Sequence, residues 1–363
     1  MIIIYIPAYN ILYKNFVYNS FVERKRFDEI DFIKAVGIIG VIAIHILTYS
    51  LTNPLNKFLW NNLQFVVMAF VFSSGFVLAN RYLTSFTSIT KTLGWYKKRL
   101  LRLIIPFYIY LIAHYSLWIL FPHIFGGLGL KANLGYFVKS AFLFSGTNYN
   151  FLPLLFIQFT ILFPFFAIWI KKKKVLAVYI FFSLLITAIF TMFKFPYEYY
   201  RQTMWVPWSL ILLLSMYVSI WAQKDKSETQ TNKRYLVLGV LFFVLFLAFY
   251  ILNFDSANSL NFYDHKYPPD FYYLSFGTSI TFFAILIGKL RFWQNKYVKS
   301  IYYFISINSY AIFFIHYIIL DAVLVLAKQN SILQNPVLQF IIVFFPTIFI
   351  LLIYQNLKKS FKK

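Results

Sequence analysis

Long runs of apolar residues alternate with short polar segments along almost the whole chain. Each run is close to the about 20 residues that a helix needs to cross the hydrocarbon core of a bilayer. Helices are expected because every backbone polar group in lipid must be satisfied within its own segment, and the alternation typical of an outer-membrane barrel is weak here. The pattern predicts an all-α integral membrane protein, a bundle of ten transmembrane helices at residues 31–52, 59–80, 102–121, 151–170, 175–193, 204–222, 235–253, 271–290, 301–326 and 336–357.

The composition leaves little room for anything but a membrane domain. Of the 363 residues, 61% are hydrophobic and 12% are charged, whereas a soluble domain carries roughly 25% charged residues. We expect one ten-helix domain over residues 31–357, between a cytoplasmic or interfacial segment at 1–30 and a basic cytoplasmic tail at 358–363. Residues 1–22 have no basic start and no small-residue cleavage site, so a secretory signal is not expected. The absence of cysteine excludes disulfides and thiolate chemistry.

The net charge of +23 could suggest a nucleic-acid partner, but the distribution of the charge indicates a membrane. Of the 34 lysines and arginines, 27 fall in the N-terminal segment, around the loops after spans 2, 4, 6 and 8, and in the tail, and 7 fall in the intervening loops. Cytoplasmic loops are rich in Lys and Arg, so both termini are expected in the cytoplasm. The protein is predicted to be a multi-pass protein of the cytoplasmic membrane, with basic loops that face anionic lipids rather than nucleic acid.

The first span carries three ionisable residues, and such residues inside a membrane are candidates for function because they are costly to bury. They are Asp31, Lys34 and His45. Lys34 and His45 are eleven residues apart, so on a helix they differ by about 20° in direction and by about 16 Å in height. We expect Lys34 at the cytoplasmic edge and His45 on the same stripe, past the midplane toward the outside. The alternative is that Lys34 snorkels to the interface and His45 only bonds a neighbouring helix.

The ninth span contains a second group of polar residues. Ser309 and His316 are seven residues apart and share a helix face, whereas Asp321 is about 7.5 Å further along and rotated by about 140°. An aspartate at this depth needs a partner, so we expect Asp321 to support the site or to pair two helices. The other three histidines are predicted to be structural or to lie free in outer loops: His114 in span 3, and His123 and His265 in loops.

Two further patterns lie toward the cytoplasmic side. Arg99 and Arg102 share a face near the predicted start of span 3, where two guanidinium groups can clamp phosphates. Positive-inside placement alone also explains arginines there. Near the end of span 2, Ser74 and Gly75 belong to a small-residue segment that either packs helices closely or forms a narrow groove for a ligand.

These features together resemble the membrane acyltransferase-3 family, the ten-helix integral membrane acyltransferases of the cell surface. The matching stretches occur in the family's order: FDEIDFIKAVGIIGVIAIH, FVFSSGF, KKRLLRLIIPFY, FLPLLFIQFTILFP, KYPPDFYYLSFG and SINSYAIFFIH. The spacing of Lys34 and His45 resembles the family's signature in span 1, and Arg99 and Arg102 resemble its RxxR motif. The chain departs from the family at Lys34, where Arg is more usual, and at Gln158, where many members carry Glu.

The resemblance implies transfer of an acyl group, usually acetyl, from cytoplasmic acyl-CoA to a hydroxyl of an extracytoplasmic or lipid-linked glycan. It implies acyl-CoA as a co-substrate, with no permanently bound cofactor and no metal. The histidine would act as a general base or carry the acyl group transiently. The residues assigned to these roles are His45 and His316 for catalysis, Lys34, Arg99, Arg102, Ser74 and Gly75 for donor binding, and Asp31, Ser309, Asp321 and Gln158 for support.

Two other classes of protein fit part of the pattern. A transporter or flippase of glycans or lipid-linked sugars would also have positive loops and embedded His and Asp residues. It explains the RxxR motif and the one-sided arrangement of Lys34 and His45 less well. A structural or sensory membrane subunit leaves the embedded ionisable residues without a role.

The charge asymmetry predicts which loops are accessible from outside, and the absence of native cysteines gives a clean background for labelling. In intact cells, one set of introduced cysteines should be shielded from an impermeant thiol reagent, at Lys173, Ser227 and Lys362. A second set should react with it, at Asn56, Asn148 and Asn258. The opposite result at two or more positions would overturn this topology.

Overall fold

The computed structural model describes residues 26–128, 133–143, 150–193, 199–225, 227–255 and 260–360. The secondary structure of these residues is helical, with no β-strand among them. Most of the predicted N-terminal segment and the end of the predicted tail lie outside the described residues, as do the labelling positions Asn148, Asn258 and Lys362.

The ten predicted spans are confirmed as ten helices, or pairs of consecutive helices, that are long and apolar enough to cross a membrane. Their bounds are α2 (Asp28–Leu47), α3 with α4 (Pro54–Asn62 and Phe65–Tyr82), α5 (Ile89–Leu120), α8 (Phe151–Trp169), α9 (Lys173–Met192), α10 with α11 (Tyr200–Thr203 and Trp205–Lys224), α12 (Glu228–Asp255), α13 (Phe271–Gly288), α14 (Lys296–Gln329) and α15 (Pro336–Ser360). Three short helical segments connect them: α6 (Pro122–Phe125), α7 (Leu134–Ala141) and η3 (Ser331–Gln334).

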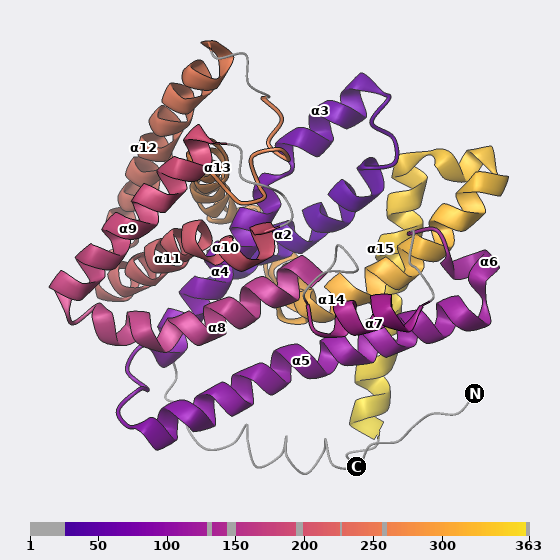
Figure 1. Cartoon of the computed structure of the whole chain (residues 1–363), viewed down its shortest axis with the longest axis horizontal. Helices are drawn as coiled ribbons and strands as arrows, with labels where there is room; N and C mark the ends of the chain where they lie inside the picture. The colour runs from indigo at the N-terminus through magenta and orange to yellow at the C-terminus, as the bar shows by residue number, and fades with distance from the viewer. Residues whose placement is uncertain are drawn as a thin grey trace.

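Six of the ten spans form the inside of the bundle, and four form its outside (Figure 1). More than half of the apolar stretch is buried in the inner spans, which are α2, α3 with α4, α8, α10 with α11, α13 and α14. One third or less is buried in the outer spans α5, α9, α12 and α15. Their exposed apolar side chains suit contact with lipid, so polar chemistry that must avoid lipid belongs on the inner helices.

Helix α2 is central, since it packs against α4, α13, α14 and α15. Gly40 sets its distance from α4: a Cβ at this position would overlap the side chain of Val66. Small residues of this kind let two helix backbones approach closely in a membrane. The close approach holds the C-terminal half of α2, which carries His45, against α4.

Several helix ends differ from the predicted ones, and two of these differences affect the candidate site. Helix α5 begins at Ile89, capped by the Ser88 hydroxyl, because its polar first turns extend the helix beyond the apolar run. Arg99 and Arg102 therefore lie well inside a helix, and their predicted place near a helix start was wrong. Helix α2 ends at Leu47 rather than residue 52, so His45 lies in its last turn.

Candidate active site

Two histidines from distant parts of the chain meet inside the bundle. His45 Nδ1 on α2 lies 3.0 Å from His316 Nε2 on α14, and the two rings are stacked with an interplanar angle of 7°. His316 Nδ1 lies 3.1 Å from the carbonyl oxygen of Ile312. Because a carbonyl only accepts, Nδ1 of His316 must carry its proton. Neutral His316 is then an acceptor at Nε2, and His45 must donate from Nδ1.

This arrangement leaves the lone pair of His45 on Nε2, which accepts a hydrogen bond of 2.8 Å from the hydroxyl of Tyr317. The result is a chain of hydrogen bonds with one direction, from Tyr317 through His45 and His316 to the Ile312 carbonyl. His316 is fully buried, and His45 is half-buried. The backbone thus holds His45 in the tautomer that a base attacking from Nε2 requires.

Sequence analysis missed Tyr317, although it follows His316 directly. Only contact between α2 and α14, which are far apart in the sequence, gives its hydroxyl a partner on His45. The proximity of His45 and His316 likewise depends on this contact.

A small cavity of about 50 Å³ opens beside the pair. Four polar side chains line it, those of His45, Tyr317, Lys266 and Tyr267, and apolar side chains of α2, α4, α8 and α14 complete its wall. This volume is sufficient for a few water molecules. Lys266, on the loop between α12 and α13, is a second residue that sequence analysis did not select.

A cluster of cations from α2, α4 and α5 lies on the cytoplasmic side under the predicted topology. Lys34 is in electrostatic contact with Arg99 and Arg81, and Arg99 with Arg102. No described carboxylate forms an ion pair with any of these four residues. Arg99 Nε is buried without a hydrogen-bond partner among the described residues, whereas Arg102 is exposed. This cluster, which we call the cationic cluster, is suited to an anionic ligand.

The carboxylate of Asp31 borders the cationic cluster but is bound elsewhere. It accepts a hydrogen bond of 2.6 Å from Ser306 on α14 and pairs with Arg26 at 2.6 Å. Asp31 thereby ties α2 to α14 near the start of α2 and contributes only a nearby opposite charge to Lys34. Ser309 is buried one turn further along α14.

The small residues of α4 have the geometry of helix packing. The hydroxyl of Ser74 donates to the carbonyl of Phe70 at 2.8 Å, within its own helix. Gly75 faces α11, where a Cβ would overlap the hydroxyl of Ser215. Gly75 is thus required for contact between two inner helices, and its predicted role in donor binding has no separate support in the contacts.

Gln158 on α8 is placed away from the histidine pair. Its amide nitrogen donates to the carbonyl of Arg201 at 3.0 Å, and its Oε1 is buried without a hydrogen-bond partner among the described residues. Its predicted supporting role stays a prediction.

Asp321 has the partner that its depth in the membrane requires, and the partner is His114. His114 Nε2 lies 2.9 Å from Asp321 Oδ2, with both side chains almost fully buried. The other carboxylate oxygen accepts from the backbone N–H of Leu128 at 2.7 Å. The pair joins α5, α14 and the segment after α6, so its geometry is that of a structural link.

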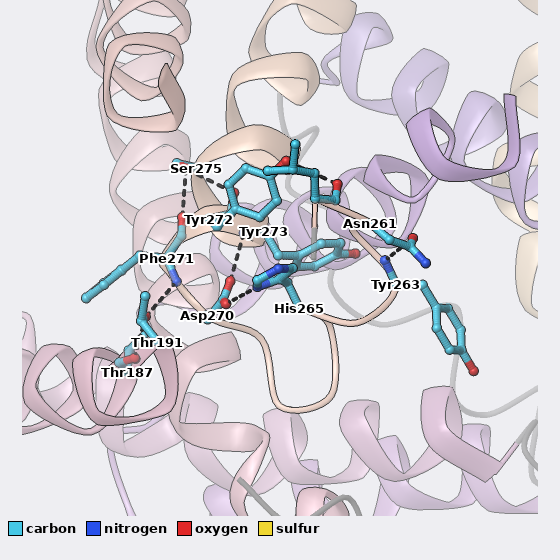
Figure 2. A network of polar contacts seen from close by, with 11 residues as sticks. Thr187, Thr191, Asn261, Tyr263, His265, Asp270, Phe271, Tyr272, Tyr273 and Ser275 are labelled. Atoms are coloured by element: carbon cyan, nitrogen blue, oxygen red, sulfur yellow. Dashed lines mark hydrogen bonds and ion pairs between the residues drawn. The ribbon is translucent and has the colours of Figure 1, made fainter. Parts of the chain in front are cut away.

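His265 was predicted to lie free in an outer loop, and this prediction was wrong. Its Nδ1 is bonded to the carboxylate of Asp270, the residue that caps α13 (Figure 2). Asp270 Oδ1 accepts from the N–H of Tyr273 at 2.9 Å. The contact closes the loop that carries Lys266.

The structural role of Asp321 can be tested by substitution. Asp321→Ala should lower stability by about 3–5 kcal/mol, the usual effect of breaking a buried pair from one side. Denaturant unfolding in detergent measures this change. Asp321→Ala protein that remains folded should retain acyl transfer. Loss of transfer with unchanged stability would instead make Asp321 part of the reaction site.

Comparison with known proteins finds similarity at the level of a family. No curated protein and no solved structure matches the chain significantly. The acyltransferase-domain family called acyltransferase 3 matches residues 27–355, nearly the whole chain. Together with the ten apolar helices, this match shows that the chain belongs to the acyltransferase-3 family and is a multi-pass membrane acyltransferase.

Proposed function

We propose that the protein takes an acyl group, most simply acetyl, from cytoplasmic acyl-CoA and transfers it to a hydroxyl of an extracytoplasmic or lipid-linked glycan at the cell membrane. The observation that carries this proposal is the directed chain from Tyr317 to His316, which holds a basic nitrogen of His45 at a cavity. The cationic cluster lies toward the other end of α2 from His45, and there the acyl donor would bind.

The cationic cluster suits the phosphates of coenzyme A. Its four side chains are not neutralised by carboxylates, and Arg99 has a buried Nε without a partner among the described residues. Phosphate oxygens would satisfy this donor, and guanidinium groups bind phosphates in a bidentate manner. Lys34 and His45 lie about 16 Å apart along α2, so a donor held at the cluster directs its long thioester arm toward the cavity.

The reaction requires a relay of protons through Tyr317 and His45 and one acyl exchange. As the acceptor oxygen attacks the thioester carbon, its proton passes to the Tyr317 oxygen while the Tyr317 proton passes to Nε2 of His45. The new C–O bond forms and the carbonyl oxygen takes the electron pair. When this intermediate collapses, the C–S bond breaks and the thiolate receives the proton back from His45, which restores the neutral imidazole.

We favour general-base catalysis over an acyl-histidine intermediate because of what occupies Nε2. A hydroxyl already lies there at 2.8 Å, in the position that a proton-donating group takes. A thioester carbon could reach Nε2 only after Tyr317 moved away. In this account His316 is a positioning residue that fixes the tautomer of His45.

The transporter alternative is weaker than acyl transfer. Membership of an acyltransferase family supports a chemical role for His45 and His316.

Donor binding should depend on Arg99 and Arg102. Substituting either with alanine should weaken acyl-CoA binding by about 10- to 100-fold, since a hydrogen bond to a charged group contributes about 1.5–3 kcal/mol. Arg102→Lys should restore binding only in part because the bidentate fork is lost. Titration calorimetry in detergent measures these affinities, with Lys173→Ala as a control that removes a cytoplasmic charge from α9. Wild-type affinity in both alanine variants would leave these arginines a role in topology only.

Transfer should depend on the lone pair of His45. His45→Ala and His45→Gln should lower the rate by about 10²–10⁴-fold, the usual contribution of a general base, while acyl-CoA affinity stays at the wild-type level. His316→Ala should lower the rate less, because it removes only the group that orients His45. Transfer of labelled acetyl groups in membrane vesicles gives the rates. A His45→Ala rate within about tenfold of wild type would remove His45 from the mechanism.

A further inference from the structure

The loop between α12 and α13 carries a buried cation that the steps above leave without a role. Lys266 is 2% exposed, and no described carboxylate forms an ion pair with it. Its ammonium donates to Oε1 of Gln64 at 3.1 Å and lies 5.2 Å from the ring centre of Tyr267. Buried charges are normally paired because their desolvation is costly. A buried ammonium without a carboxylate marks a place where negative charge is expected to arise or bind.

The ammonium is held in place from two directions. Gln64 is itself fixed, because its amide nitrogen donates to the carbonyl of Trp60 at 2.9 Å. On the loop side, His265 bonds Asp270, and Figure 2 shows this contact at the start of α13. The N–H of Phe262, also in the loop, donates to the Asn61 side chain at 2.7 Å. The position of Lys266 is therefore set by α3, α4 and α13 together.

Lys266 lines the same cavity as His45 and Tyr317. Two of its three N–H donors remain after the bond to Gln64. An acyl carbonyl that reaches this cavity would lie beside these donors. An oxyanion that forms on it during the reaction would then accept hydrogen bonds from the ammonium.

We propose that Lys266 is a catalytic residue whose ammonium stabilises the oxyanion of the tetrahedral intermediate, while Gln64 positions it. The inference rests on the acyl-transfer function proposed above. When the acceptor oxygen bonds to the thioester carbon, the carbonyl π electrons move to oxygen, and this oxygen accepts hydrogen bonds from the ammonium. When the C–S bond breaks, the electrons return to the carbonyl. Lys266 itself neither gains nor loses a proton.

The Lys266 ammonium is expected to stabilise the transition state more than the site before reaction. Burial lowers the pKa of Lys266 to about 7, because the charged form is poorly solvated there. An oxyanion beside the ammonium removes this disadvantage, so the interaction is stronger in the transition state than before it. The titratable groups that share this environment are His45, Tyr267, Tyr317 and Tyr273, the last through Gln64.

The experiment compares Lys266→Met and Lys266→Arg with wild type, using labelled acetyl-CoA in membrane vesicles. Lys266→Met should lower kcat by about 10²–10³-fold, as loss of an oxyanion donor does, with acyl-CoA affinity and acceptor KM unchanged. Its thermal midpoint should not fall, because an unpaired buried charge has been removed. Lys266→Arg should retain more activity than Lys266→Met. Lys57→Met, on exposed α3, is the control and should behave as wild type.

The pH profile separates a charge effect from a packing effect. Wild-type kcat should fall as pH rises through about 7, because the ammonium loses its proton while His45 stays in its active neutral form. Lys266→Arg should not show this fall. A Lys266→Met variant with kcat within about threefold of wild type would overturn the inference, as would a change confined to acceptor KM, which indicates binding of an anionic acceptor. Absence of transfer by the wild-type protein would instead refute the proposed function itself.

Discussion

The hydrogen-bond chain from Tyr317 through His45 and His316 to the Ile312 carbonyl is the constraint on which the rest of the structure depends. Polar side chains in a bilayer are costly unless they are bonded. Each member of this chain donates a hydrogen bond to the next. The chain ends on a backbone carbonyl, which can only accept, so the direction of the hydrogen bonds is fixed. The packing of α2 against α14 follows from this requirement as much as from apolar contact. The same chain leaves one basic nitrogen at the cavity.

Two sets of positive charges lie on opposite sides of this hydrogen-bond chain. The cationic cluster lies on the predicted cytoplasmic side and carries no described carboxylate partner of its own. Lys266 lies on the other side, in a loop closed by His265 and Asp270. Asp31 is bonded to Ser306, and Asp321 is bonded to His114. Neither carboxylate forms an ion pair with the cationic cluster or with Lys266, which lie at the two ends of the proposed acyl path.

The parts of this arrangement that could be predicted from sequence are the local ones. Ten spans follow from apolar runs, and the shared stripe of Lys34 and His45 follows from helix periodicity. The start of α5 was misplaced because hydropathy marks the apolar stretch and not the polar turns that precede it. Tyr317, Lys266 and the pairing of His114 with Asp321 could not be predicted, because each depends on contacts between segments far apart in the chain. The stretch KYPPDFYYLSFG, which begins with Lys266, was among those that resemble the family, but nothing local singled out its lysine.

Acyl transfer across the membrane is the central claim, and one measurement addresses it directly. Sealed inside-out membrane vesicles are given labelled acetyl-CoA on the cytoplasmic face, and the glycans inside are then analysed by mass. Label on glycan hydroxyl groups with the wild-type protein, and none above background with His45→Gln, is the predicted result. Equal labelling with both proteins, or glycan movement across the membrane without any labelling, would contradict the account.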